Sequence, residues 1–275
     1  MTNTSQEHAQ SGYASVNGLE LYYEIHGSGE PLVLLHGGLG VGSMFGDVLT
    51  SLSQSQQVIA VDLQAHGRTA DIDRPLRYEH MADDIAALIQ HLGFTKTNVM
   101  GYSLGGGVAL RTAIQHPELV KKLVLISAPF KQSGWFPEVV AGMAQVNASG
   151  VEFMRETPMY QSYMSVAPKP ENFPTLLDKV GVMMSEEYDW SAEVAALTMP
   201  VLLVYGDADS ISPAHAAQFF ELLGGGKRDA DWNGSGMSNS RLAILPATTH
   251  YTVFLSPALV PIVTPFLDAP LPQAA

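Results

Sequence analysis

Short, uninterrupted runs of apolar residues recur along the chain and predict buried β-strands. Runs that do not alternate with polar residues suit strands covered on both faces, as in a parallel sheet. These runs lie at residues 32–35, 58–63, 99–100, 123–126, 201–205 and 242–245. The segment 11–26 is different, because Asn17-Gly18 stands between β-prone stretches and tolerates the positive φ angles of a tight hairpin turn. We therefore expect an antiparallel hairpin followed by parallel strands.

Helical patterns lie between the apolar runs. In the segment 81–92, Ile85, Leu88 and Ile89 fall on one face at helical spacing. Further helices are expected at 104–115, 214–223 and 259–267. Strands that alternate with helices predict an α/β fold with a doubly wound, mostly parallel sheet. The Gly/Asn/Ser-rich stretch 224–240 should be a long surface loop.

Residues 130–198 interrupt this alternation, because they contain no apolar run typical of a parallel strand. We predict a helical cap over 130–198, inserted into an α/β core of residues 11–129 and 199–270. The cap is rich in methionine and aromatic residues, which form adaptable apolar pocket walls. The same residues could equally be the core of a small helical subdomain. We expect Met159 and Trp190 to contact a substrate.

The composition narrows the classes of partner and site. The 275 residues carry a formal charge of −13, which disfavours nucleic acid and anionic membranes as partners. The absence of cysteine excludes disulfides, thiolate metal sites and a cysteine nucleophile. Residues 1–10 lack the apolar core of a signal peptide, and no run is long enough to span a membrane. We expect a cytoplasmic protein without a cofactor or metal; its oligomeric state is left open.

One five-residue pattern carries a candidate nucleophile. Residues 101–105 read Gly-Tyr-Ser-Leu-Gly, after an apolar strand and before a glycine-rich helix start. A serine on such a sharp turn projects its hydroxyl above the sheet, and only glycine fits two residues to either side. Ser103 is therefore the predicted nucleophile, and the neighbouring Tyr102 is expected to contact the substrate.

A serine hydroxyl needs a base, and nine histidines are available. His250 follows the last strand and precedes the last helix, so we choose it. His36 and His66 follow earlier strands and are expected to shape loops. The acid that orients the base can be Asp207 or Asp209, and the spacing favours Asp209 because it lies further into the loop.

The negative charge of an acyl-transfer intermediate needs two backbone N–H donors. Leu104 follows the nucleophile directly and should supply one. The second should come from the loop 36–40, where Gly38 lets a substrate carbonyl approach the bare backbone.

These pieces resemble the α/β-hydrolase superfamily, in its small serine esterase, lactonase and cofactor-free haloperoxidase branch. The resemblance extends over nearly the whole chain and rests on residues 36–37, 62–68, 101–106, 206–213 and on His250. It implies that the second Asp of Gly-Asp-x-Asp, Asp209, is the acid, and that the residue after His-Gly, Gly38, is an oxyanion donor. The chain departs from relatives at Gln64-Ala65, where they often have Arg-Gly, and at Thr249, where many have Gly.

The resemblance implies hydrolysis of a carboxylic ester, such as a medium-chain acyl ester, by way of an acyl-enzyme. Alternatives on the same site are a lactonase for acylated homoserine lactones, a cofactor-free haloperoxidase or perhydrolase, and an esterase for bulky pyrethroid-type esters. Epoxide hydrolases and haloalkane dehalogenases of this fold carry Asp where this chain has Ser103, which argues against both. A nucleotide-binding module lacks its motif here, and an inactive receptor does not need a complete site.

Overall fold

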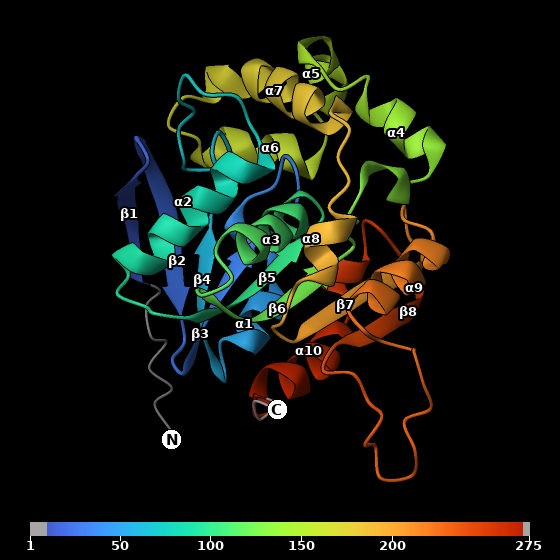
Figure 1. Cartoon of the computed structure of the whole chain (residues 1–275). Helices are drawn as coiled ribbons and strands as arrows, with labels where there is room; N and C mark the ends of the chain where they lie inside the picture. The colour runs from blue at the N-terminus through green and yellow to red at the C-terminus, as the bar shows by residue number, and fades with distance from the viewer. Residues whose placement is uncertain (1–9, 272–275) are drawn as a thin grey trace, which may run out of the picture.

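The computed structural model describes residues 10–271 and contains one eight-stranded sheet (Figure 1). The strand order is β1-β2-β4-β3-β5-β6-β7-β8. β1 pairs with β2, and β2 with β4, in antiparallel fashion, whereas all later pairs are parallel. The strands are β1 (Gln10–Val16), β2 (Leu19–His26), β3 (Glu30–Leu35), β4 (Gln56–Val61), β5 (Thr97–Tyr102), β6 (Val120–Ile126), β7 (Val201–Ala208) and β8 (Arg241–Thr249).

Helices cover both faces of the sheet, so the predicted doubly wound α/β fold is confirmed. One apolar layer joins α2, α3 and α9 to one face, and a second joins α1 and α10 to the other. The α-helices are α1 (Asp47–Leu52), α2 (Tyr78–His91), α3 (Leu104–Gln115), α4 (Pro137–Met143), α5 (Val151–Met154), α6 (Pro158–Val166), α7 (Phe173–Ser185), α8 (Ser191–Ala195), α9 (Pro213–Leu222) and α10 (Leu259–Asp268). The 3-10 helices are η1 (Gly42–Phe45), η2 (Gln132–Gly134), η3 (Ala148–Gly150), η4 (Pro170–Asn172) and η5 (Val253–Leu255).

The hairpin is present as predicted. β1 and β2 are joined by Asn17 and Gly18, whose φ angles are +49° and +80°. Both values lie in the left-handed region that the two central residues of such a turn require. The hairpin places two antiparallel strands at one edge of an otherwise parallel sheet.

The last strand extends further than its apolar run suggests. The run ends at residue 245, but β8 continues to Thr249, where it pairs with Ala208. A register shift interrupts the β7–β8 pairing, and Ala247 has a φ of +55°. A strand that bulges loses the regular burial on which sequence patterns depend. As a result, His250 directly follows the end of the strand.

Residues between β6 and β7 form helices and lie above the carboxyl ends of the strands, where Figure 1 shows α4, α5, α6 and α7. The two ends of this insertion run side by side, because a β-bridge joins Lys131 to Asp189. Helix α7 contributes buried apolar residues, including Leu176 and Val180. The division into a core and a cap at residues 130 and 198 stays a prediction.

No helix in residues 10–271 is long and apolar enough to cross a membrane. The stretch between α9 and β8 has neither helix nor strand, as predicted, and Figure 1 shows it extending away from the body.

Candidate active site

Ser103 lies on the sharp turn between β5 and α3. Its φ is +52° and its ψ is −118°, a strained conformation for a residue with a side chain. The turn depends on the flanking glycines. A Cβ on Gly101 would collide with the Gly105 carbonyl, and a Cβ on Gly105 would collide with the His36 carbonyl. The backbone is therefore strained at one position, and this conformation places the Ser103 hydroxyl at a helix N-terminus.

His250 connects this hydroxyl to a carboxylate. Its Nε2 lies 3.0 Å from the Ser103 Oγ, and its Nδ1 lies 2.9 Å from the Asp209 Oδ1. Because a carboxylate only accepts hydrogen bonds, Nδ1–H must donate to Asp209, which leaves the Nε2 lone pair to accept from the serine. The structure thus brings together the three residues predicted from strand order and spacing.

Asp209 is held as a charged acceptor. Its Oδ2 accepts hydrogen bonds from the Ser127 hydroxyl and, at 3.1 Å, from the Gly206 N–H. Burial alone would raise the pKa of Asp209, but the hydrogen bonds from His250 and Ser127 outweigh it and lower that pKa. A carboxylate that stays ionised can stabilise an imidazolium beside it.

Asp207, the other candidate acid, has a different role in this geometry. Its side chain is exposed, and its Oδ1 accepts a hydrogen bond of 3.3 Å from the Thr248 N–H. This contact braces β7 against the end of β8, and the described contacts of His250 include no bond to Asp207. The geometry therefore favours Asp209, in agreement with the spacing argument.

The loop after β3 lies beside the serine. A Cβ on Gly37 would come within 3.5 Å of the Ser103 Cβ, and one on Gly38 would lie 3.5 Å from the Leu104 side chain. The two predicted donors, Gly38 and Leu104, are therefore neighbours in space; their role as an oxyanion hole stays a prediction. Packing demands glycine at Gly37 and Gly40, where a Cβ would clash with neighbouring side chains, but not at Gly38 itself.

Comparisons with known proteins agree with this architecture. The family model described as "alpha/beta hydrolase fold" matches residues 30–159. The solved structure of E-2-(acetamidomethylene)succinate hydrolase superposes on the chain with a TM-score of 0.74 at 22% identity, covering 95% of this chain and all of that one. The chain therefore has the α/β-hydrolase fold.

Two curated relatives align with most of this chain. A pimeloyl-[acyl-carrier protein] methyl ester esterase of Nitrosomonas europaea is 27% identical over 252 residues, covering 84% of this chain and 92% of the relative. A non-heme haloperoxidase of Rhodococcus erythropolis is 27% identical over 263 residues, covering 85% and 90% respectively. These similarities support a hydrolase of this fold, without deciding its substrate.

Two further histidines, His36 and His66, shape the loops beside the site. The Nε2 of His36 accepts the Leu63 N–H at 3.0 Å, and its Nδ1 lies 2.7 Å from the Gly37 carbonyl. His66 Nδ1 lies 2.8 Å from the Gln64 carbonyl. Burial lowers the pKa of His36 to about 4 and that of His66 to about 3, so both rings are neutral near pH 7.

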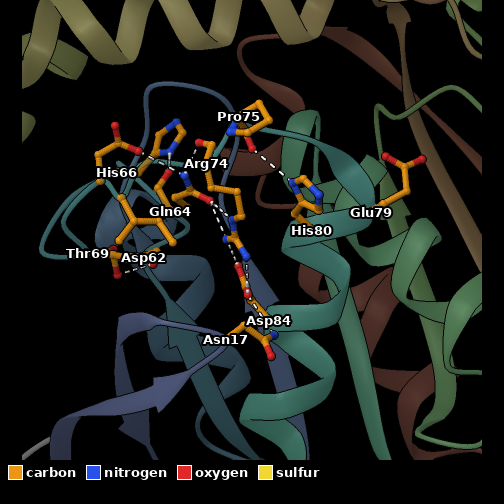
Figure 2. A network of polar contacts seen from close by, with 12 residues as sticks. Asn17, Asp62, Gln64, His66, Thr69, Arg74, Pro75, Glu79, His80 and Asp84 are labelled. Atoms are coloured by element: carbon orange, nitrogen blue, oxygen red, sulfur yellow. Dashed lines mark hydrogen bonds and ion pairs between the residues drawn. The ribbon is translucent and has the colours of Figure 1, made fainter.

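Figure 2 shows a polar network below these loops, around one departure from the relatives. Gln64 stands where relatives often have Arg, and its Oε1 accepts from the Arg74 Nε at 2.9 Å. The same guanidinium pairs with Asp84 of α2, which also accepts from the amide of Asn17 at 3.0 Å. A guanidinium from position 74 thus ties the loop to α2 and to the hairpin turn.

The network extends to the helices above the sheet. Lys179 of α7 places its Nζ 2.6 Å from the Asp71 carboxylate and 2.9 Å from each of the Ile72 and Arg74 carbonyls. Because three oxygens satisfy all three N–H groups of the ammonium, α7 is fixed to the loop that follows β4.

Two of the residues predicted to contact a substrate, Tyr102 and Trp190, are packed against other side chains of the protein. The Tyr102 ring stacks on Phe254 at 4.4 Å, and its hydroxyl donates to the His250 carbonyl at 2.8 Å. Trp190 is buried and packs edge-on against Tyr78 at 5.2 Å. Both side chains are therefore largely covered by other parts of the protein, and their contact with a substrate stays a prediction. Burial also raises the pKa of Tyr102 above its ordinary value. Met159, on α6, is 36% exposed, and its contact with a substrate stays a prediction.

Sequence reasoning missed two residues of the site. Ser127 follows β6 with a φ of +49° and donates to Asp209. Trp135 lies against the His250 ring, with 5.2 Å between ring centroids. The position of Ser127 just beyond an apolar strand could have signalled it, whereas no local pattern marks Trp135. Within residues 10–271, no cluster of three or more His, Asp or Glu side chains is arranged to hold a metal ion.

Proposed function

We propose that the chain is a serine hydrolase that cleaves carboxylic esters through an acyl-enzyme. One observation carries the proposal. Ser103, on a strained turn, is hydrogen-bonded to His250, which is hydrogen-bonded in turn to Asp209. This order of nucleophile, base and acid is the arrangement that activates a hydroxyl at neutral pH.

The reaction begins when the Ser103 Oγ attacks the ester carbonyl carbon and its proton moves to the Nε2 of His250. The carbonyl oxygen becomes an oxyanion beside the N–H groups of Gly38 and Leu104. Each such donor contributes about 3–4 kcal/mol of transition-state stabilisation. Asp209 holds the Nδ1–H and balances the charge of the imidazolium.

The tetrahedral intermediate then collapses, and the imidazolium gives its proton to the leaving alkoxide. This leaves an acyl group on Ser103 and a neutral His250. A water molecule loses its proton to His250 and attacks the acyl carbon, which releases the carboxylic acid and restores the hydroxyl. The similarity to a methyl ester esterase supports an ester substrate.

A second candidate is perhydrolysis, in which hydrogen peroxide takes the place of water in the second step. The similarity to a non-heme haloperoxidase favours it, and the same three residues would serve both reactions. Cyclic esters such as acylated homoserine lactones would also follow the hydrolytic steps.

A single substrate panel tests these proposals. It comprises p-nitrophenyl esters of increasing chain length, acyl-homoserine lactones, and a peroxidation assay with hydrogen peroxide and a carboxylic acid. We expect ester cleavage by the native protein and none by Ser103→Ala. Ester turnover retained by purified Ser103→Ala would rule out the mechanism. A preference for lactones or peroxide would reassign the substrate without changing the roles of the residues.

A further inference from the structure

Trp135 is the aromatic residue that connects the helical insertion to the imidazole of His250. It precedes α4, the first α-helix of the insertion, and only 6% of its surface is exposed. The centroids of its ring and of the imidazole lie 5.2 Å apart, and the ring planes make an angle of 70°. A large apolar side chain is therefore packed against the proposed base.

The backbone around Trp135 is joined to the loop that carries the acid. A β-bridge pairs Trp135 with Ile211, and the Phe136 N–H donates to the Ser210 carbonyl at 3.1 Å. Ser210 and Ile211 directly follow Asp209, and Ile211 is buried. One short antiparallel contact thus fixes the backbone of Trp135 relative to the loop that carries the acid.

The two hydrogen bonds of the His250 imidazole resist tilting of the ring only weakly. Bonds at Nδ1 and Nε2 lie in the ring plane, so they resist in-plane displacement more strongly than tilting about the axis between the two nitrogens. Tyr102 contacts the ring from one direction, with centroids 5.3 Å apart and planes 36° apart. Trp135 meets the ring at a much steeper angle and supplies a second apolar contact.

We infer that Trp135 is a positioning residue for His250 and couples the insertion to the catalytic geometry. The inference rests on the proposed function, because it assigns His250 the role of general base. Trp135 contacts neither the Ser103 hydroxyl nor a reacting atom in this account. It acts by keeping Nε2 aligned with Ser103, and a misalignment of about 1 Å can reduce a rate about 100-fold.

The matched variants are Trp135→Leu and Phe173→Leu. Both aromatic residues are buried in the insertion, but Phe173 packs on Tyr160 and makes no described contact with His250. With p-nitrophenyl acetate, we expect Trp135→Leu to lower kcat about 10- to 100-fold and to leave KM unchanged. Labelling by a fluorophosphonate should slow in parallel, because that reaction needs Ser103 and His250 but no acyl pocket. Trp135→Phe should restore both rates, and Phe173→Leu should lower only the melting temperature.

Several results would overturn the inference. They are native kcat and labelling rates in folded Trp135→Leu, a loss confined to KM, and an equal loss in Phe173→Leu. Should Trp135→Leu fail to fold, Ile211→Ala loosens the backbone that holds the indole, and its kcat should fall several-fold at constant KM; an unchanged kcat would overturn the inference equally. If the native protein is not labelled at Ser103, the proposed function itself fails, which distinguishes the two outcomes.

Discussion

Two pairs of aspartate and histidine occupy the same edge of the sheet and differ in their hydrogen-bond partners. Asp62 and His66 follow β4, whereas Asp209 and His250 follow β7 and β8. All four side chains are buried. The carboxylate of Asp62 accepts the N–H groups of Gly42 and Arg68, so it ties one loop to another. Asp209 instead accepts from His250, whose other nitrogen meets the nucleophile.

The difference lies in what the nitrogens contact. The described bonds of His36 and His66 are to backbone atoms, and burial holds both rings neutral near pH 7. The described side-chain hydrogen bonds of His250 are to Ser103 and Asp209, whose side chains can exchange protons. The carboxylates differ as well, because burial raises the pKa of Asp62 despite its backbone bonds, whereas bonding lowers that of Asp209. Two pairs of the same composition therefore differ in the atoms that complete their hydrogen bonds, and only Asp209 and His250 have the partners that the proposed mechanism requires.

The largest expected effect is a loss of kcat that distinguishes His250 from His66. His250→Asn should lower kcat for p-nitrophenyl butyrate by about 10⁶-fold, because removing the base of such a triad removes nearly all its activation of serine. His66→Asn should leave kcat within about tenfold, since it does not touch Ser103, and should reduce the free energy of unfolding instead. Steady-state kinetics and urea unfolding of both variants measure kcat and the free energy of unfolding. Equal losses of kcat in the two variants would contradict the different roles assigned to His250 and His66.

The two candidate acids allow a similar test. Asp209→Asn should lower kcat about 10⁴-fold, because an amide in place of the carboxylate favours the wrong tautomer of His250. Asp207→Asn removes only an exposed brace to Thr248 and should leave kcat within about threefold. Should Asp207→Asn produce the larger loss, the assignment of the acid would be reversed.

Acid should weaken the fold through its buried histidines. Burial lowers the pKa of His36 and His215 to about 4 and that of His66 to about 3, below the ordinary histidine value of about 6.5. As pH falls from about 6.5 to about 4, the unfolded chain binds protons that the native rings refuse, so stability present above pH 6.5 is lost. At pH 4.5 each of the three rings should lower the free energy of unfolding by about 2 kcal/mol relative to pH 7.

Urea unfolding at pH 7 and pH 4.5 measures this loss. The matched variant His91→Gln changes an exposed histidine and should leave the difference between the two pH values unaltered. A free energy of unfolding that is the same at both pH values would contradict the prediction, because the buried histidine rings would then bind protons as readily in the folded protein as in the unfolded chain.

The smallest effect concerns the departure from the relatives at Ala65. This residue has a φ of +65°, which costs about 1 kcal/mol for a residue with a Cβ. Ala65→Gly should therefore raise the free energy of unfolding by up to about 1 kcal/mol. Ala87→Gly, within helix α2, should lower it by a similar amount. Thermal or urea unfolding of both variants checks the opposite signs, and a destabilising Ala65→Gly would contradict the account.

The sequence predicts those parts of the molecule that obey local rules. Ser103 was found because a sharp strand-to-helix turn permits only glycine at Gly101 and Gly105, and His250 because it follows the last apolar run. The apolar runs likewise located the parallel strands. The end of β8 was misplaced because a bulge breaks the burial pattern that marks a strand.

Contacts between distant segments left no such signal. Trp135 meets His250 across 115 positions of the chain, where backbone contacts with Ser210 and Ile211 hold it. Trp190 is a tryptophan of the same insertion and is equally expected to be buried, yet it packs on Tyr78. Apolar character predicts that a side chain is buried, but which neighbours bury it depends on how the helices between β6 and β7 lie over the sheet.

Covalent trapping tests the central claim most directly. The native protein is treated with a fluorophosphonate at neutral pH, digested, and mapped by mass spectrometry, with Ser103→Ala treated in parallel. The account predicts one modified serine, Ser103, in the native protein and none in the variant, with much slower labelling in Asp209→Asn. Absence of the label from Ser103, or equal labelling of Ser103→Ala, would contradict it.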